Sequence, residues 1–446
     1  MKRILKLIVW VMLLGLPVVM TSCDLGFFDN PVSPDLKVLK PSITVQVGKS
    51  YRCNVHASTK AKLTFTSADP SIATVDSYGV VTGVKTGKTT IAVKTSGVDD
   101  FYNSIFYVET ATIDVEVIKL DVPVKSVKLD KTTLTATLGD DPVKLVATVN
   151  PDNADFKTVE WTTSDETVVE VEDGVVTFVG AGTATITATA TNGTEETGDD
   201  KTATCEVTVY NLVNLAAQTA NYTAQEYDIL TGTLGANVKI SIAAGATVTL
   251  KDANINGVDD SNYLWAGITC VGDATIILSG TNTVKGFQQH YPGITVAVDK
   301  TLTIKGDGKL TASCNGGWGA GIGAGRYTWY SCGNIEIQGG DITATGGPYG
   351  AGIGASEEGT CGNITISGGK ITATGGTYGA GIGGGNQSYC GDITITDGVT
   401  QVTATRGANG QHSIGKGKTD NANYGTVTIG GVVGYISALT YTYPAP

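Results

Sequence analysis

The 446-residue sequence predicts an all-β chain in which two β-sandwiches precede a parallel β-helix, a solenoid of stacked coils. Three observations lead to this prediction. Nearly the same segment occurs three times between Gly317 and Gly385, with a period of roughly 30 residues. Apolar and polar residues alternate within each copy, which is typical of strands. Short alternating strands separated by turn residues also fill the part of the chain before the repeats.

Each copy contains a glycine-rich step and then a Cys-Gly pair that opens a strand. The glycine-rich steps are Trp318-Gly-Ala-Gly-Ile-Gly323, Tyr349-Gly-Ala-Gly-Ile-Gly354 and Tyr378-Gly-Ala-Gly-Ile-Gly383, and the pairs begin at Cys332, Cys361 and Cys390. Units this short cannot bury a core alone, so they must stack on one another. One copy therefore corresponds to one coil, and equivalent residues of successive coils are expected about 4.8 Å apart.

Weaker copies extend the solenoid in both directions. Trp265-Ala-Gly-Ile268 and Tyr291-Pro-Gly-Ile294 keep the aromatic residue and the isoleucine, while Gln411-His-Ser-Ile-Gly415 and Thr426-Val-Thr-Ile429 form a degenerate last coil. Terminal repeats are expected to be atypical because they cover the exposed end of the stack. The solenoid is therefore placed at residues 211–446.

The first residues predict export. A charged start that contains Lys2 and Arg3 precedes an apolar run ending at Met20, and Thr21-Ser22-Cys23 follows as a small-residue cleavage site. The run is short for a membrane span. It resembles a bacterial lipoprotein signal, which implies that residues 1–22 are removed and that Cys23 carries a lipid. An ordinary secretory signal is the alternative. Residues 23–36 would then be a short tether.

Residues 37–120 and 123–210 are each expected to form a β-sandwich. The second shows about six or seven short strands with turn signals roughly every 8 to 12 residues. Its Val149-Asn-Pro151, Trp161-Thr-Thr-Ser-Asp165 and Gly182-Thr-Ala-Thr-Ile186 segments resemble the bacterial Ig-like domain of group 2. The first sandwich repeats this pattern less completely and has Phe65 where the second has Trp161. The resemblance implies spacer or adhesion modules.

The charge of the chain excludes one class of partner. Asp and Glu number 42 against 30 Lys and Arg, a net charge of −12, and residues 211–446 contribute 15 acidic and 11 basic residues. Neither the solenoid nor the part before it carries the basic surface that nucleic-acid binding needs. We therefore expect no nucleic-acid partner.

The three repeat cysteines are expected to lie one above another, because they are 29 residues apart. Adjacent coils bring two thiols within the reach of a disulfide, but three in a row cannot all pair. A buried thiol also behaves as a small hydrophobe. A column of stacked thiols, one disulfide within it, and a metal site are the interpretations that stay open.

Aromatic residues are the candidates for ligand binding. One set precedes the glycine–isoleucine step in consecutive coils and is expected to line one face: Trp265, Tyr291, Trp318, Tyr349 and Tyr378. The loops add Tyr327, Trp329, Tyr330 and Tyr389. Exposed rings beside glycines can stack against sugar rings, but the same rings can also stack on one another without a ligand. Trp329 and Tyr330, in a loop that differs between the copies, are favoured for ligand contact.

The sequence offers little for catalysis or cofactor binding. Glycoside hydrolysis needs two facing carboxylates, one of them with a raised pKa, whereas Glu336, Asp341 and Asp392 lie on separate strands. Asp259-Asp260 and Glu357-Glu358 are expected in loops, the latter pair at a solvated tip. His56, His290 and His412 are isolated and expected at the surface. The runs 256–260 and 306–308 could donate oxygens to calcium but lack the spacing of known calcium loops, so no cofactor is expected.

The repeat Gly369-Lys-Ile-Thr-Ala-Thr-Gly-Gly376 gives the solenoid a recognisable pattern. It resembles the single-stranded, right-handed β-helical carbohydrate-binding proteins of polysaccharide-degrading bacteria, over about residues 240–430. The resemblance implies a ligand among acidic or plant cell-wall polysaccharides, sometimes with calcium.

The leading hypothesis is a lipid-anchored protein on the outer-membrane surface of a Gram-negative bacterium. In it, two Ig-like spacers display a β-helix that binds a polysaccharide or host glycan. A structural or protein-binding adhesin is the alternative, and a polysaccharide lyase or hydrolase is less supported.

Overall fold

The computed structural model describes residues 35–57, 62–96, 108–120, 122–191, 197–418 and 424–444. Among them there is no α-helix, only three short 3-10 turns: η1 (Thr197–Asp199), η2 (Leu215–Ala217) and η3 (Thr328–Tyr330). The prediction of an all-β chain is confirmed. No helix in these ranges is long and apolar enough to cross a membrane. The predicted signal peptide and Cys23 lie outside the described residues.

The chain divides into two compact units, one built on the first sandwich and the other on the second sandwich together with the solenoid. The first sandwich has one sheet ordered β2 (Ser42–Gln46), β9 (Thr110–Ile118), β8 (Gly87–Thr95), β5 (Leu63–Ser67), and another ordered β3 (Ser50–Arg52), β7 (Val80–Gly83), β6 (Ala73–Val75). A short pair, β1 (Lys37–Val38) and β4 (Val55–His56), lies beside them. Alternation along β8 and β9 places Ile91, Val93 and Ile113 in a core that excludes solvent.

The second sandwich repeats this plan. One sheet contains β14 (Val159–Thr163), β17 (Gly182–Ala190), β18 (Lys201–Asn214) and β11 (Thr133–Thr137), and another β12 (Val143–Lys144), β16 (Val175–Phe178) and β15 (Val169–Glu172). The strands β10 (Ser126–Leu129) and β13 (Ala147–Asn150) form a separate pair.

An aromatic ring packs on a glycine in both sandwiches. Phe65 covers Gly79 and Trp161 covers Gly174, each glycine with a positive φ, and a Cβ at either glycine would come within 2.8 Å of the ring. Only glycine combines this backbone conformation with so close a contact. The two rings therefore hold the same place in their sandwiches.

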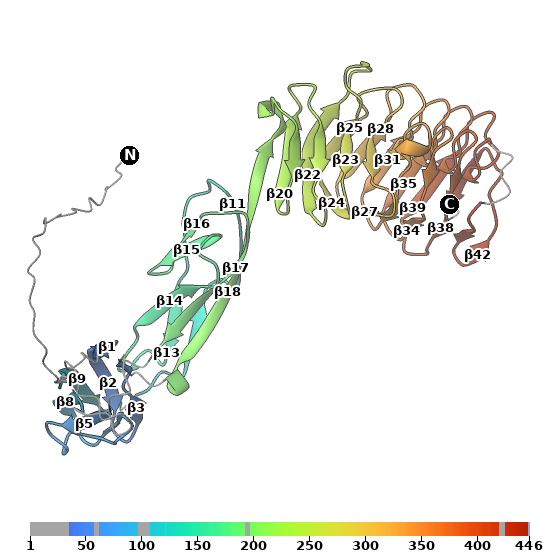
Figure 1. Cartoon of the computed structure of the whole chain (residues 1–446). Helices are drawn as coiled ribbons and strands as arrows, with labels where there is room; N and C mark the ends of the chain where they lie inside the picture. The colour runs from blue at the N-terminus through green and yellow to red at the C-terminus, as the bar shows by residue number, and fades with distance from the viewer. Residues whose placement is uncertain are drawn as a thin grey trace, which may run out of the picture. The chain divides into compact units, whose positions relative to one another are not determined.

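The solenoid is a stack of parallel coils whose strands form two continuous sheets (Figure 1). The sheet of longer strands contains β20 (Asp228–Thr233), β22 (Thr247–Asn256), β24 (Ala274–Ser279), β25 (Thr281–Lys285), β27 (Thr301–Gly306), β28 (Lys309–Ser313), β30 (Asn334–Ile337), β31 (Asp341–Thr345), β34 (Ile364–Ile366), β35 (Lys370–Thr374), β38 (Ile393–Ile395), β39 (Gln401–Thr405) and β41 (Val427–Ile429). The sheet of short strands contains β19 (Tyr222–Ala224), β21 (Ile240–Ile242), β23 (Ile268–Cys270), β26 (Ile294–Val296), β29 (Ile322–Gly323), β32 (Ile353–Gly354), β36 (Ile382–Gly383) and β40 (Ile414–Gly415).

Isoleucines form ladders in the solenoid core. In the short-strand sheet Ile322, Ile353 and Ile382 are in register on neighbouring coils, and all three are fully buried. Because each coil contributes the same side chain at the same position, the core is continuous along the axis. At the far end β42 (Val432–Val433) and β43 (Thr440–Tyr443) pair antiparallel with β41 and β39, which ends the parallel stack.

Strand β18 belongs to both the second sandwich and the solenoid. Its residues up to Tyr210 pair with β17 and β11, and Asn211–Asn214 pair in parallel with β20. Figure 1 shows this strand running from the sandwich into the first coil. The predicted division between residues 210 and 211 therefore falls inside one strand, at the point where its partners change.

Candidate functional site

The aromatic residues of the repeats separate into two groups. Trp318, Tyr349 and Tyr378 each lie four residues before an in-register isoleucine, and their rings stack. The centroids of Trp318 and Tyr349 are 6.0 Å apart at an interplanar angle of 14°, and those of Tyr349 and Tyr378 are 5.0 Å apart at 18°. We call these three rings the aromatic column.

Trp265 and Tyr291 do not belong to this column, so the five rings predicted to line one face do not form a single stack. They lie three residues, not four, before Ile268 and Ile294, and their rings contact Phe287 and Tyr330 instead. The place above Trp318 is taken by His290, at a centroid distance of 4.8 Å. His290 lies four residues before Ile294, the same spacing that separates Trp318 from Ile322. This spacing is the sequence signal that identifies His290 as the neighbour of Trp318.

Two of the histidines predicted at the surface are half-buried. His290 packs on Trp318, and His412 lies 5.1 Å from Tyr435, centroid to centroid. Burial, assisted by the nearby Arg326 guanidinium, lowers the pKa of His290. His56 is exposed, as expected.

Cationic side chains flank both ends of the aromatic column. The Arg326 guanidinium lies 4.4 Å from the Trp318 ring and 4.3 Å from that of Tyr327, and Lys418 Nζ lies 5.0 Å from the Tyr378 ring. Arg326 also forms a 2.6 Å ion pair with Glu357. Glu357 is only 8% exposed, so its prediction as a solvated loop tip is wrong. Neighbouring rings and cationic groups therefore cover the ring faces of the column, and Glu357 neutralises Arg326. This arrangement is expected for rings that stack on one another without a ligand.

Four of the nine candidate residues meet in one cavity of about 420 Å³, which we call the aromatic groove. These are Trp265, Tyr291, Trp329 and Tyr330. The Trp265 ring lies 5.7 Å from that of Phe287, and the Tyr291 and Tyr330 rings lie 4.8 Å apart, all between centroids. The Trp329 side chain is 71% exposed beside them. Tyr389, on the small strand β37 (Tyr389–Cys390), belongs to neither group.

The groove runs over four consecutive coils. Its lining includes Lys239 before β21, Thr269 of β23, Thr295 of β26, and the Trp329-Tyr330 loop after β29. At about 4.8 Å per coil, this corresponds to a length of about 14 Å. The loop exists because Gly323 and Cys332 are nine positions apart, whereas Gly354 and Cys361 are seven apart. This insertion of two residues distinguishes the loop that carries Trp329 and Tyr330 from the loop of the next copy.

The lining of the groove is close to electrically neutral. Among the described residues that form it, Lys239 alone is charged at neutral pH. Burial raises the pKa of the Tyr291 hydroxyl, and its hydrogen bond with Tyr330 raises it further, so this hydroxyl keeps its proton. Thr269, Thr295 and Ser331 add hydroxyl groups. The groove therefore offers ring faces and hydroxyls.

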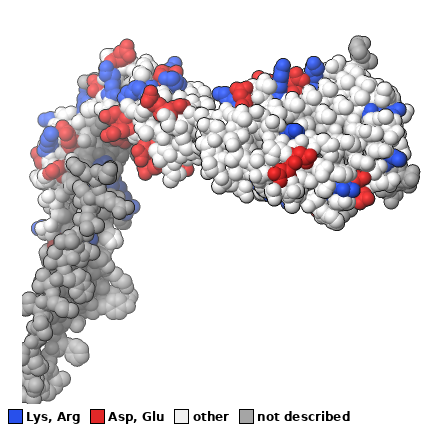
Figure 2. All heavy atoms as spheres, turned by 90° about the horizontal axis from the view of Figure 1, so that it is seen from above, with Lys and Arg blue, Asp and Glu red and all other residues white. Residues whose placement is uncertain are grey.

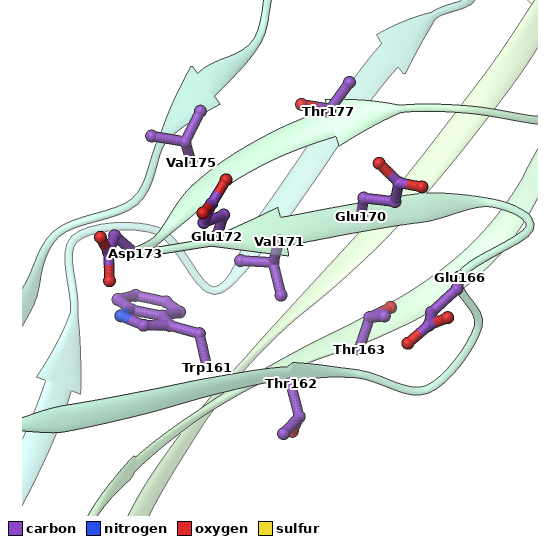
Figure 3. A pocket seen from close by; sticks show the side chains of 10 residues that line it. All are labelled: Trp161, Thr162, Thr163, Glu166, Glu170, Val171, Glu172, Asp173, Val175 and Thr177. Atoms are coloured by element: carbon purple, nitrogen blue, oxygen red, sulfur yellow. The ribbon is translucent and has the colours of Figure 1, made fainter. Parts of the chain in front are cut away.

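A larger cavity, of about 810 Å³, lies in the second sandwich between β14 and β15 (Figure 3). Figure 3 shows Trp161 and Val171 on opposite walls, with Glu166, Glu170 and Glu172 around them. The first sandwich has a related cavity of about 760 Å³ beside Phe65, where Arg52 and Lys62 supply the charges. Each of the two sandwiches therefore has a cavity beside its equivalent aromatic residue, Trp161 or Phe65.

The repeat cysteines form a ladder of free thiols. Cys332 and Cys361 bring their Sγ atoms to 3.1 Å, and the Cys390 thiol donates to the Gly383 carbonyl at 2.9 Å. Hydrogen bonds with the neighbouring thiols and burial hold the pKa of Cys361 well above its usual value. Within the described ranges, no group of three or more His, Cys, Asp or Glu residues is arranged to hold a metal ion. Asp259 and Asp260, considered for calcium, instead accept hydrogen bonds from the backbone N–H groups of Gln289 and Asn262.

Comparison with known families supports both parts of the architecture. Residues 32–100 and 123–200 match the family described as bacterial Ig-like domain (group 2). Residues 302–326, 335–357 and 364–386 match the family described as beta helix repeat. The chain therefore contains bacterial Ig-like domains and a β-helix repeat region, which together suggest a surface-type protein.

Similarity to individual proteins is local. A stretch of 54 residues is 59% identical to an alpha-L-arabinofuranosidase of Bifidobacterium longum subsp. longum, and 57 residues are 49% identical to a 3-O-alpha-D-galactosyl-alpha-L-arabinofuranosidase of the same organism. These stretches cover 12% and 13% of this chain but 5% of either enzyme. The chain thus spans about a twentieth of the length of these relatives.

Two solved structures match part of the chain. Mouse cadherin-23 EC22-24 is 14% identical with a TM-score of 0.18, over 44% of this chain and 73% of that one. Domains 5-6 of the S-layer protein SbsC are 18% identical with a TM-score of 0.19, over 40% of this chain and 99% of that one. With TM-scores this low, neither likeness carries an argument about this chain.

Proposed function

We propose that this protein is a lipid-anchored surface protein that binds glycan in the aromatic groove. The observation that carries the proposal is the meeting of Trp265, Tyr291, Trp329 and Tyr330 in one cavity of about 420 Å³. Small-ligand sites typically occupy roughly 300 to 1,000 Å³ and combine aromatic walls with a few polar groups. The groove has this composition.

The geometry favours an extended ligand with flat apolar faces. Sugar rings present C–H groups that pack against aromatic faces, and their hydroxyls need hydrogen-bonding partners. Trp329 supplies an exposed ring, and Thr269, Thr295 and Ser331 supply hydroxyls along the floor and wall. A segment of a few sugar rings matches the length of about 14 Å given by four coils.

Recognition would involve one groove and not a similar site on every coil. A repeated architecture can offer many weak sites along one face. In the later coils, however, Trp318, Tyr349 and Tyr378 stack on one another in the aromatic column, so a ligand does not have free ring faces there. Affinity would therefore depend on the first coils and on the loop that carries Trp329.

The remaining parts of the chain would place this groove away from a membrane. The predicted lipidation of Cys23, on the outer-membrane surface of a Gram-negative bacterium, supplies the anchor, and the two Ig-like domains act as spacers. Catalysis is not part of the proposal, since neither Asp nor Glu occurs among the described residues that line the groove.

The test is a glycan array followed by titration calorimetry with the full-length protein in detergent. Wild type is expected to bind at least one plant or host polysaccharide, and Trp329→Ala to weaken this binding at least about tenfold, as expected for an exposed aromatic anchor. Tyr389→Ala is the matched control, because Tyr389 is also exposed but lies outside the groove. An empty array, or equal losses in both variants, would contradict the proposal; a captured protein partner would then favour the adhesin alternative.

A further inference from the structure

We infer that the aromatic groove selects neutral polysaccharide segments over uronic-acid polymers and does so without calcium. This inference rests on the proposed function and adds the chemical class of the ligand. It departs from the class that the family resemblance implies, which includes acidic polysaccharides that are sometimes bound with calcium.

The first argument is the charge of the groove. A polyuronate carries one carboxylate on each ring, and a carboxylate removed from water needs a cationic or hydrogen-bonding partner. Lys239, at the first of the four coils, is the one cation among the described residues of the lining. Leu264, Val271 and Trp329, which are 56%, 50% and 71% exposed, present apolar surface along the rest. Most carboxylates of a bound polyuronate would therefore lack a cationic partner and could accept hydrogen bonds only from the uncharged hydroxyl groups of the groove.

The second argument is the arrangement of hydroxyl groups. Thr269 and Thr295 are in register on neighbouring strands β23 and β26, so one side-chain hydroxyl follows another along the groove. Ser241 occupies the same position on β21, one coil earlier, although it is 6% exposed. Hydroxyls donate and accept hydrogen bonds without a net charge. They are suited to the hydroxyls of a neutral sugar chain.

The third argument concerns calcium. A calcium ion takes about six to eight oxygen ligands, among which carboxylates are prominent. None of the described residues that line the groove carries a carboxylate, and Asp259 and Asp260, which lie outside the lining, accept backbone hydrogen bonds. Figure 2 shows that charged side chains are also sparse over the face of the solenoid seen there. The described lining therefore offers no carboxylate through which calcium could bridge the groove to an acidic glycan.

The experiment compares oligosaccharides of equal length by calorimetry with the full-length protein in detergent. The neutral probes are xylo- and cello-oligosaccharides and the acidic probe is oligogalacturonate, each measured with calcium and with a chelator. We expect at least one neutral probe to bind at least about tenfold more tightly than oligogalacturonate, and its affinity to be unchanged by the chelator. Tighter binding of oligogalacturonate, or loss of neutral binding with the chelator, would overturn the inference.

A charge-insertion pair tests the electrostatic reason. Thr269→Lys adds a cation in the groove and is expected to raise oligogalacturonate affinity about tenfold, whereas Thr365→Lys, at a half-exposed threonine on the long-strand sheet, is the matched control. Equal effects of the two variants would overturn the electrostatic account.

The outcomes also separate this inference from the function on which it rests. Oligogalacturonate binding that Trp329→Ala abolishes would keep the groove as a glycan site and overturn its neutral selectivity. Absence of binding by every probe, together with an empty glycan array, would overturn both.

Discussion

The coils around the aromatic groove and the coils of the near-identical repeats share the same isoleucine core. They differ in the residue that follows this isoleucine. In β32 and β36 the residue after the isoleucine is Gly354 or Gly383, where a Cβ would collide with a carbonyl oxygen of the next coil. In β23 and β26 the same position holds Thr269 or Thr295, and a cavity lies above it. Near-identity between copies therefore reflects close packing between coils, whereas the aromatic groove lies over the divergent copies and the longer loop of the first near-identical copy.

Gly354→Ala is expected to show the largest effect, because it places a Cβ against backbone in a tightly stacked coil. Gly354 also has a φ of +130°, which side-chain-bearing residues rarely adopt. We expect a loss of about 3 kcal/mol or more in the free energy of unfolding, measured by chemical denaturation. Thr295→Ala, in a groove coil, is the control, with an expected loss below about 1 kcal/mol. Similar losses in both variants would erase the distinction between the two kinds of coil.

Tyr349→Ala and Tyr291→Ala should separate stability from binding. Tyr349 stacks on rings of both neighbouring coils, so its removal is expected to cost about 1 to 3 kcal/mol in unfolding free energy while glycan binding by the folded protein is retained. Tyr291 lines the groove, so its removal should weaken binding at least about tenfold. Thermal unfolding and calorimetry on the same samples measure both quantities, and the reverse assignment would refute the division into column and groove.

The buried thiols predict a loss of stability at alkaline pH. Burial raises the pKa of Cys270, on a groove coil, to about 12, from the ordinary value of 9.0 that applies when the chain is unfolded. Between these values the unfolded chain loses a proton that the folded chain keeps, so stability falls as the pH rises, by up to about 1.4 kcal/mol per pH unit for this thiol. Denaturation curves between pH 8 and about 11 measure the slope. Cys270→Ala should reduce it, and an unchanged slope would exclude this thiol as its source.

The smallest effect is expected at acid pH from His290, the residue above the aromatic column. Its pKa is lowered by burial, so the unfolded chain binds a proton first as the pH falls through about 6.5. Stability contributed by the neutral imidazole is present above this pH and is lost below it. His290→Phe should keep the ring contact with Trp318 and remove this dependence. NMR titration of the histidine is the direct measurement, and a pKa at or above the ordinary value would contradict the expectation.

Architecture followed from the sequence because its signals are local and repeated. Alternation identified the strands, the period identified the coils, and Ile322, Ile353 and Ile382 form the ladder that the three copies predict. The same logic misplaced Tyr291, because a degenerate copy is one residue shorter before its isoleucine, and one residue changes the direction of a side chain.

The site was harder to predict because it depends on which loops meet across coils. Trp265 and Trp329 are 64 positions apart in the sequence, yet they line one groove. The burial of Glu357 depended likewise on Arg326, from the preceding coil. A single sequence gives the position of such residues along the chain, but the contacts between coils decide which of them meet.

Strand β18 has a mechanical consequence. It is one strand of 14 residues that begins beside β17 and ends beside β20, with no loop between the second sandwich and the first coil. A pull along this strand loads its hydrogen bonds to both neighbours in shear, so many of them must break together before the connection lengthens. Tension from a bound surface would then reach the sandwich without first extending a flexible linker.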